Sequence, residues 1–245
     1  MSGHNKWSTI KNKKAKTDAA KGKIFTKIGR EIVIAVKAGG SADPAQNSKL
    51  KDVIAKAKAA NMPNDNIKRV LEKAAAAGTG DAYESITYEG HGPCGVAVIV
   101  ETMTDNRNRT AGSVRHHFDK FGGSLGTNGC VSWSFDKKGV IVIDNEDGEL
   151  DEDAVMMDAL DAGAADFQPE EGCYTVYTDP ADFNAVAKAL EDKGYTFESA
   201  QIEMVPQTYQ KLEKPEDIAN MEKMLDLFEE DDDVQNVWHN WDQEE

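Results

Sequence analysis

The strongest constraint on the fold is a change in the spacing of apolar residues near position 80. Isoleucine and valine recur every four residues over 24–36, which predicts an amphipathic helix that the following glycines end. A second helix is expected after the N-cap Asp43, with Pro44 at its first position, and a third is expected over 64–77. Residues 23–78 therefore predict a small three-helix domain.

Beyond position 80 the apolar period changes repeatedly between roughly 2 and 3.6, which is typical of strands that alternate with helices. One series of elements follows the order βαββαβ of a ferredoxin-like domain. Its elements are strand 140–143, helix 150–162, strands 165–168 and 174–178, helix 180–193 and strand 195–199. A second series is split around the first and consists of strands 95–103, 131–136, 201–205 and 234–239 with helices 106–121 and 215–230.

We therefore predict an α+β, multidomain chain, in which an N-terminal three-helix domain is followed by two ferredoxin-like (βαββαβ) domains, one inserted in the other. Each ferredoxin-like domain is expected to be an antiparallel sheet with helices on one face. The predicted limits are 1–80 for a basic arm plus the three-helix domain, 81–138 with 200–245 for the discontinuous α/β domain, and 139–199 for the inserted domain.

Charge is distributed along the chain as unevenly as the apolar residues. The formal net charge is −16, yet residues 1–80 carry a net +11 and residues 81–245 a net −27. A basic segment joined to an acidic body is typical of a polyanion binder, because the body stays soluble and repels nucleic acid that is not specifically bound. We expect nucleic acid as the partner, either DNA or ribosomal RNA on the ribosome, with a protein contact through the acidic domains as an addition.

The highest density of cations lies in the first thirty residues. Nine lysines and arginines occur between positions 6 and 30, a density suited to neutralising phosphates, although a solvated lysine-rich surface is the alternative. Trp7 lies outside any apolar stripe and is expected either to stack on an exposed base or to dock on the helical domain. The predicted nucleic-acid contacts are Lys6, Trp7, Lys11, Lys13, Lys14, Lys16, Lys21, Lys23, Lys27 and Arg30.

The helix expected over 64–77 is the one candidate for reading DNA sequence. A recognition helix needs exposed arginine, asparagine or glutamine aimed at base edges, and this segment offers Asn64, Asn66, Lys68 and Arg69. Its other face is an alanine run, and lysine supplies most of the basic charge of the region, which favours phosphate contacts over base contacts. Binding that does not depend on base sequence is the stronger expectation.

The most concentrated polar motif of the acidic part is Asp105-Asn106-Arg107-Asn108-Arg109-Thr110, where a strand is expected to enter a helix. An N-cap explains the first residues, since Asp105 or Asn106 can accept from free backbone N–H groups. Arginine at a helix start is disfavoured by the helix dipole unless an anion is its partner. A second contact is therefore expected here with a ligand, ribosomal RNA or a carboxylate of another domain, through Asn106, Arg107, Asn108 and Arg109.

Two other segments have plain structural explanations. The glycines of 122–129 follow a helix and precede a strand, the reverse of the order in a phosphate-binding loop, so a mobile helix-to-strand turn is expected. The acidic run 229–233 lies at the end of a predicted helix, where the dipole disfavours negative charge. A solvated loop is the first expectation for this run, and a metal ion or a basic protein is the alternative.

Several classes of function are disfavoured. No set of nucleophile, base and oxyanion donors and no H-E-x-x-H or G-x-S-x-G pattern occurs, so we expect no catalytic residue and no enzyme activity. The three cysteines lie far apart without a C-x-x-C pair, and we expect neither a metal nor a cofactor. No apolar run approaches the roughly 18 residues of a membrane span, so we expect a cytoplasmic protein with no membrane partner.

Motifs that carry a family resemblance follow one another along the whole chain. They are Gly3-His4-Asn5-Lys6-Trp7 with Ile10-Lys11-Asn12-Lys13-Lys14, Lys23-Ile24-Phe25-Thr26-Lys27, Tyr88-Glu89-Gly90-His91-Gly92-Pro93, Asp105-Asn106-Arg107-Asn108-Arg109-Thr110, Gly122-Gly123-Ser124-Leu125-Gly126 and Asp232-Asp233-Val234-Gln235. By these motifs the sequence resembles the YebC/PmpR proteins, whose mitochondrial relatives include a translational activator of cytochrome oxidase. The resemblance implies an all-helical N-terminal domain followed by two α/β domains, and a role in gene expression.

The expected function is that of a non-enzymatic nucleic-acid-binding regulator of gene expression. The resemblance implies a DNA-binding transcriptional regulator, which is the usual label of the family. The first alternative is a translation factor, a translational activator that binds ribosomal RNA on the ribosome. The second alternative, from a different class, is a scaffold that binds proteins.

Overall fold

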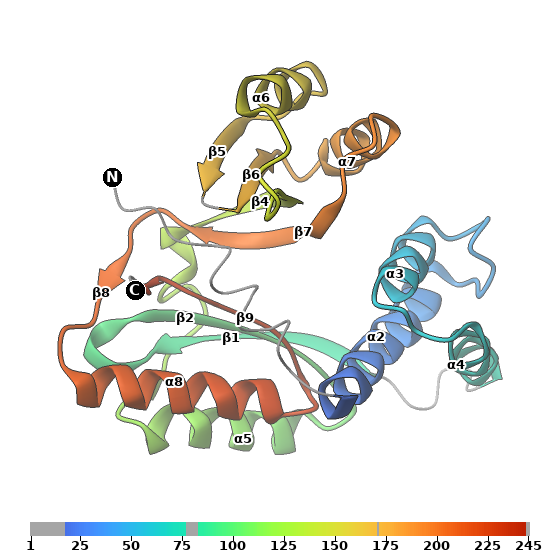
Figure 1. Cartoon of the computed structure of the whole chain (residues 1–245). Coiled ribbons are helices and arrows are strands. Elements are labelled where there is room, and N and C mark those ends of the chain that lie inside the picture. The colour runs from blue at the N-terminus through green and yellow to red at the C-terminus, as the bar shows by residue number, and fades with distance from the viewer. Residues whose placement is uncertain (1–17, 77–82, 171, 244–245) are drawn as a thin grey trace. The chain divides into compact units, whose positions relative to one another are not determined.

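The chain forms two compact units (Figure 1). The larger unit contains the described residues up to 132 together with 212–239, and the smaller unit contains 133–211 together with 240–243. No described helix is long and apolar enough to cross a membrane. The computed structural model describes residues 18–76, 83–170 and 172–243.

The larger unit begins with the three predicted helices. They are α2 (Asp18–Gly39), α3 (Ser48–Ala59) and α4 (Asn64–Ala76). Their apolar stripes meet in one core, because residues spaced by three or four positions share a helix face. Its buried members include Ile28, Ile32, Leu50, Ala57 and Ile67.

The second helix begins later than predicted. Its N-cap is Asn47 and not Asp43, because the Asn47 side-chain oxygen accepts from the backbone N–H of the third helical residue at 3.1 Å. The amide group of the same buried side chain donates to the Ala35 carbonyl of α2 at 2.8 Å. A carboxylate at this position cannot donate, and Asp43 instead accepts from the Ala45 N–H in a preceding turn.

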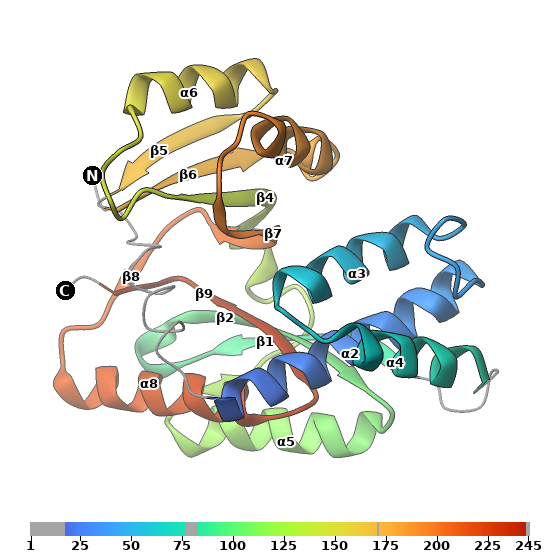
Figure 2. The ribbon, with the colours of Figure 1, turned by 45° about the vertical axis from the view of Figure 1, so that its right-hand side comes forward.

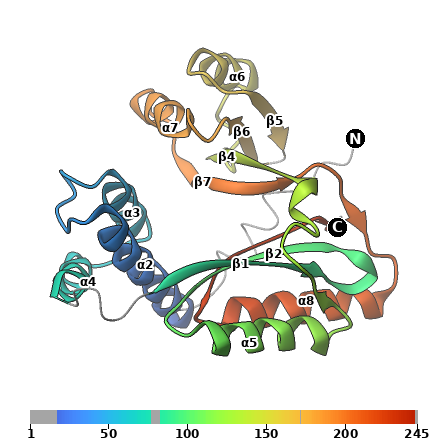
Figure 3. The ribbon, with the colours of Figure 1, turned by 180° about the vertical axis from the view of Figure 1, so that it is seen from behind.

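A four-stranded antiparallel sheet forms the rest of the larger unit, in the order β3-β1-β2-β9. The elements of this part are β1 (Glu84–His91), β2 (Ala97–Thr104), α5 (Arg107–Lys120), β3 (Ser124–Leu125), α8 (Pro215–Glu230) and β9 (Val234–His239), with a short 3-10 turn at Pro93–Gly95. A second 3-10 turn, Ser132–Ser134, lies where the chain passes into the smaller unit. Helices α5 and α8 cover one face of this sheet (Figure 3). Buried side chains of this unit include Val98, Val100, Phe118, Met224 and Phe228.

Strand β1 was not predicted, because its apolar alternation is incomplete. Ile86 and Tyr88 are its inward apolar positions, but the next inward position is Gly90. This glycine is required by close packing, since an added Cβ would lie 2.6 Å from the Ser124 carbonyl oxygen and 2.9 Å from the Phe118 ring. The strand that completes the sheet is therefore 84–91, and not the predicted strand 201–205.

The smaller unit is a second antiparallel sheet in the order β5-β6-β4-β7. Its elements follow the βαββαβ order of the ferredoxin-like arrangement, with α6 and α7 on one face (Figure 2). They are β4 (Phe135–Asp144), α6 (Glu152–Asp161), β5 (Asp166–Glu170), β6 (Cys173–Thr178), α7 (Phe183–Asp192) and β7 (Phe197–Pro206). A short parallel pair, β8 (Gln210–Lys211) with β10 (Trp241–Asp242), completes the unit.

Two strands of the smaller unit are longer than predicted. The end of the strand predicted over 131–136 continues through 140–143 in the one strand β4, whereas 132–134 form a 3-10 turn. The strands predicted over 195–199 and 201–205 are joined in the one strand β7, which begins at Phe197. The two long strands pair along their whole length, from Phe135 with Pro206 to Ile143 with Phe197. The α+β class is confirmed, and the division into three domains at the predicted limits stays a prediction.

Candidate nucleic-acid interface

The predicted phosphate contacts have different places in the structure. Lys21 lies on α2, but its side chain is not among the described ones. On the same helix Lys23 is exposed, Lys27 is half-buried, and the half-buried Arg30 contacts an internal carboxylate. The remaining candidates lie outside the described residues: Lys6, Trp7, Lys11, Lys13, Lys14 and Lys16.

Helices α2, α3 and α4 carry more cations than their own acids neutralise. Residues 18–76 contain twelve lysines and arginines against six aspartates and glutamates. Among the described side chains of these helices two ion pairs are made, Lys56 with Glu31 at 2.7 Å and Lys68 with Glu72 at 3.9 Å. Exposed cations that form no ion pair within the described part of the chain are Lys23, Lys37, Lys49, Lys51, Lys58, Arg69 and Lys73.

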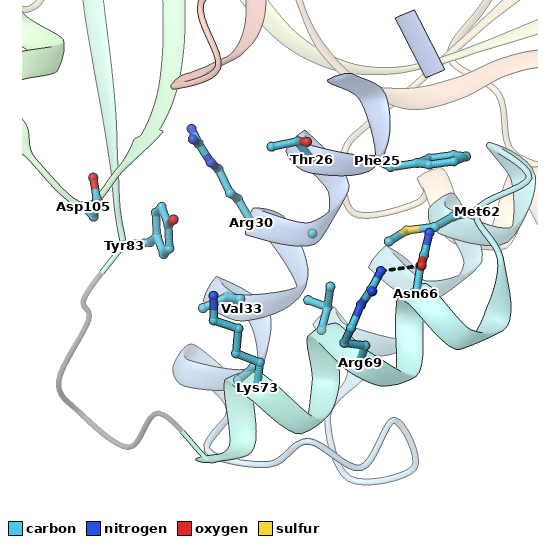
Figure 4. A pocket seen from close by; sticks show the side chains of 13 residues that line it. Phe25, Thr26, Arg30, Val33, Met62, Asn66, Arg69, Lys73, Tyr83 and Asp105 are labelled. Carbon is cyan, nitrogen blue, oxygen red and sulfur yellow. Dashed lines mark hydrogen bonds between the residues drawn. The ribbon is translucent and has the colours of Figure 1, made fainter. Parts of the chain in front are cut away.

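A groove of about 500 Å³ lies between α2 and α4 (Figure 4). One stripe of each helix lines it, because positions three, four, seven and eight apart share a helix face. The lining residues are Phe25, Thr26, Gly29, Arg30 and Val33 of α2, Asn66, Arg69, Val70, Lys73 and Ala74 of α4, and Met62, Tyr83 and Asp105.

The groove combines positive charge with apolar and aromatic surface. Arg69 donates to the Asn66 side-chain oxygen at 2.6 Å, and the Arg30 guanidinium lies 5.6 Å from the centroid of the Tyr83 ring. Of the thirteen lining residues that the structure describes, three are cations and one, Asp105, is an acid. Its carboxylate already accepts from Arg109 at 2.9 Å, so the groove carries an excess of positive charge.

The groove itself was not predicted from the sequence. Asn66 and Arg69 were singled out as residues that could contact bases, but Phe25 and Tyr83 come from other segments, and only the fold brings them to the same groove. A signal was present in α4, since Asn66, Arg69 and Lys73 recur at the spacing of one helix face.

A buried carboxylate in the same unit binds two of the predicted contact residues. Asp233 is 5% exposed, and its carboxylate accepts from Arg30 at 2.8 Å and from Arg109 at 2.8 Å. The Thr110 hydroxyl donates to it at 2.7 Å, and the Thr104 hydroxyl at 3.3 Å. Burial alone raises the pKa of Asp233, but the hydrogen bonds from Arg109 and Thr110 and the charges of the two arginines bring it below its ordinary 3.8.

The polar motif at 105–110 is thus divided between structural roles and exposed residues. Asn106 is the N-cap of α5, because its side-chain oxygen accepts from the Arg109 N–H at 3.1 Å. Arg109 is bound to the carboxylates of Asp105 and Asp233. Both acids lie in the same unit as Arg109 and not in another domain, so that part of the expectation was wrong, and a contact with a ligand or ribosomal RNA stays a prediction. Arg107 and Asn108 are exposed on the first turn of the helix.

The acidic run 229–233 is not simply a solvated loop: the prediction was wrong for the half-buried Asp231 and the buried Asp233, whereas Asp232 is exposed as expected. Asp233 is buried among donors from α2, β2 and α5. Asp231 lies 3.0 Å from the His117 ring nitrogen Nε2. The sequence showed five acids in a row, but a buried acid needs partners that come from distant segments, and the acidic run does not reveal those partners.

The segment 122–132 is held by a buried acid that the sequence did not single out. The Glu89 carboxylate accepts from the backbone N–H groups of Gly129 at 2.8 Å, Val131 at 3.0 Å and Ser132 at 2.8 Å. Burial alone raises the pKa of Glu89, but these three donors bring it below its ordinary 4.5. These N–H groups are therefore occupied and do not form a phosphate cradle. The predicted turn is interrupted by the short strand β3, which pairs with β1. The only signal was the position of Glu89 in the 88–93 motif.

Within the described residues no group of three or more histidine, cysteine, aspartate or glutamate side chains is placed to hold a metal ion. The cysteines are free thiols in three environments: Cys94 is exposed, Cys130 is half-buried and Cys173 is buried.

Comparison with known proteins covers both the helices and the sheets. The profile described as the TACO1/YebC N-terminal domain matches residues 5–77, and the one described as the TACO1/YebC second and third domain matches residues 83–241. A probable transcriptional regulatory protein from Acetivibrio thermocellus is 61% identical over 98% of this chain and 99% of its own length. One of the same name from Ruminiclostridium cellulolyticum is 60% identical over 100% of this chain and 98% of its own.

A crystal structure shows the same fold. The conserved hypothetical protein from Aquifex aeolicus superposes with a TM-score of 0.84 at 42% identity, covering 94% of each chain. The two profiles together match nearly the whole length of this chain. The two bacterial relatives, both named as regulatory proteins, are identical to this chain at about three fifths of the aligned positions. The chain therefore belongs to the TACO1/YebC family.

Proposed function

We propose that this protein is a non-enzymatic regulator of gene expression that binds nucleic acid, in the first instance duplex DNA, through its basic N-terminal segment and the helices α2 to α4. The observation that carries the proposal is the set of exposed cations on these helices that have no acidic partner among the described residues. Clustered cations repel one another, and a polyanion relieves this repulsion and releases its own counterions on binding.

DNA is placed first because the relatives are named probable transcriptional regulatory proteins. Lysine makes up most of the unpaired cations of the helices, and lysine contacts phosphate as a point charge and does not form the bidentate base contacts of arginine. The binding we propose therefore depends mainly on charge and only weakly on base sequence.

Ribosomal RNA is the second candidate target, and one observation favours it. Arg69 and Asn66, two of the α4 residues suited to reading bases in a major groove, bond to each other within the groove. A side chain engaged in this way is less available to a base edge, which weakens the role of α4 as a recognition helix. An irregular RNA surface does not require a recognition helix.

Two fractionations distinguish the targets. Intact protein and the variant with Lys11, Lys13 and Lys14 changed to alanine are compared for co-sedimentation with ribosomes and for retention on duplex DNA, at near-physiological salt. Lysine-dependent retention on DNA supports the transcriptional regulator, and lysine-dependent pelleting with ribosomes supports the translation factor. A partner that survives nuclease treatment of a pull-down, with neither retention nor pelleting, indicates a protein scaffold and contradicts the proposal.

A further inference from the structure

We propose that the groove between α2 and α4 binds one unpaired nucleotide of a single-stranded nucleic acid. The base enters the groove, and its flanking phosphates lie against Arg69 and Lys73. This inference rests on the nucleic-acid binding of the proposed function and not on its choice of duplex DNA, and it adds an unpaired nucleotide as the part of the nucleic acid that the groove binds. It follows from four features of the groove: its volume, the apolar surface at its base around Gly29, the aromatic rings that line it, and its positive charge.

The groove has the volume and, at its base, the apolar surface that a flat nucleic-acid base needs. Its volume of about 500 Å³ is within the roughly 300–1,000 Å³ of sites that bind small ligands. Val33 and Val70 supply apolar surface, and Gly29 leaves the floor open between them. A Cβ built at Gly29 would have Val70 Cγ2, at 3.7 Å, as its only described neighbour within 4 Å. The absent side chain therefore leaves room above Val70.

An aromatic ring lies at one side of the groove. Figure 4 shows the Arg30 side chain extending from α2 toward Tyr83, and the guanidinium lies over this ring at 5.6 Å from its centroid. Arg30 is itself held by Asp233 at 2.8 Å. Base–aromatic stacking does not depend on which base is bound, so the Tyr83 ring suits any unpaired base. Phe25 lies toward the other end of the groove and adds a second aromatic surface (Figure 4).

The charge of the groove selects an anionic ligand. Arg69 and Lys73 are exposed, lie one turn apart on the same face of α4, and form no ion pair within the described residues. Asp105 is occupied by Arg109 and does not neutralise them. A base in a duplex is paired and stacked on its neighbours and cannot enter such a groove without being extruded. An unpaired nucleotide offers a flat base together with phosphates, which matches both kinds of lining.

Four labelled probes of equal length separate these contributions by fluorescence anisotropy. They are oligouridylate RNA, oligothymidylate DNA, an abasic deoxyribose-phosphate strand and a DNA duplex, each about twelve nucleotides long, a length within the range that single-strand-binding domains cover. The abasic strand has the same phosphates without bases. We expect the full-length protein to bind the two base-bearing single strands about tenfold or more tighter than the abasic strand.

The variants test the ring, the floor and the cations in turn. Tyr83→Ala should weaken binding of the base-bearing strands by about tenfold and leave the abasic strand and the duplex unchanged, whereas Tyr83→Phe keeps the ring and should keep the affinity. Gly29→Leu fills the space above Val70 with a side chain and should have the same effect as Tyr83→Ala.

Lys73→Ala tests the contacts to phosphate and should weaken binding of all single strands. Lys68→Ala is its matched control, because Lys68 lies on the same helix outside the groove and pairs with Glu72.

Thermal melting of each variant shows that it is folded before its affinity is compared. Equal affinity for the base-bearing and abasic strands in the intact protein would overturn the groove proposal while leaving the proposed function in place. The same holds if Tyr83→Ala and Gly29→Leu, both folded, bind every probe as the intact protein does. Absence of binding to all four probes would contradict the proposed function and the groove together. A difference between the RNA and DNA strands identifies which single-stranded nucleic acid the groove prefers.

Discussion

Cations of the larger unit have two contrasting environments. Arg30 and Arg109 converge on the buried Asp233, which also accepts from Thr110. Lys49, Lys51 and Lys58 of α3 are exposed and form no ion pair within the described residues. Positive charge in the sequence therefore does not by itself identify a binding surface. Cations paired with a buried acid hold distant segments together, and cations without such a partner are available to a polyanion.

The largest effect is expected where the buried acid is removed. Asp233→Ala should lower the free energy of unfolding by about 3–5 kcal/mol, because Arg30 and Arg109 lose the carboxylate on which they converge and the Thr110 hydroxyl loses its charged acceptor. Urea denaturation measures this change. Asp232→Ala is the matched control, since Asp232 is exposed and should change the stability by less than about 0.5 kcal/mol. Equal effects of the two substitutions would contradict the distinction between paired and unpaired charge.

A smaller loss is expected at the second buried acid. Glu89→Ala should cost about 2–3 kcal/mol, because three backbone N–H groups between Gly129 and Ser132 lose their charged acceptor. Amide hydrogen exchange should show faster exchange at these three positions in the variant. Glu84→Ala on the same strand is exposed and serves as the control. Unchanged exchange at 129–132 would show that Glu89 does not hold this segment.

Acidic pH should act on the same two carboxylates. The pKa of Asp233 and that of Glu89 lie below their ordinary values of 3.8 and 4.5, owing to hydrogen bonds that outweigh burial. A depressed folded-state pKa contributes stability that is present above the unfolded-state pKa and is lost as pH falls through the folded-state value. The free energy of unfolding should therefore be insensitive to these groups between about pH 7 and pH 5, and should fall below about pH 4.

The variant Asp233→Asn separates this contribution from general acid unfolding. Its amide does not titrate, so urea denaturation at a series of pH values should give a shallower decrease below about pH 4 than in the unchanged protein. The same slope in both proteins would mean that Asp233 does not take part in the acid transition.

The sequence predicted the α+β class and the three helices because apolar periodicity is a local property. The helix cap at Asn47 was missed because its second hydrogen bond reaches back to Ala35 of the preceding helix. Strand β1 was missed because a close approach of the chain requires Gly90 at a position where an apolar residue was expected. The environments of Asp233 and Glu89 could not be predicted, since their partners come from segments distant in sequence.

The smallest effect on stability is expected for the unpaired cations. Their replacement tests their role in binding, because it should change the affinity for nucleic acid and not the stability. Replacing Lys49, Lys51 and Lys58 by alanine removes three exposed charges without ion pairs in the described residues, so the free energy of unfolding should change by less than about 0.5 kcal/mol per site. If these lysines contact phosphates, the dependence of log K on log salt for duplex DNA should become shallower by about 2 to 3 units. The triple replacement of Lys120, Lys188 and Lys223, which are exposed on the acidic part, is the charge-matched control and should leave that slope unchanged. An equal change of slope in both triple variants would mean that net charge, and not the surface of the helices, determines binding.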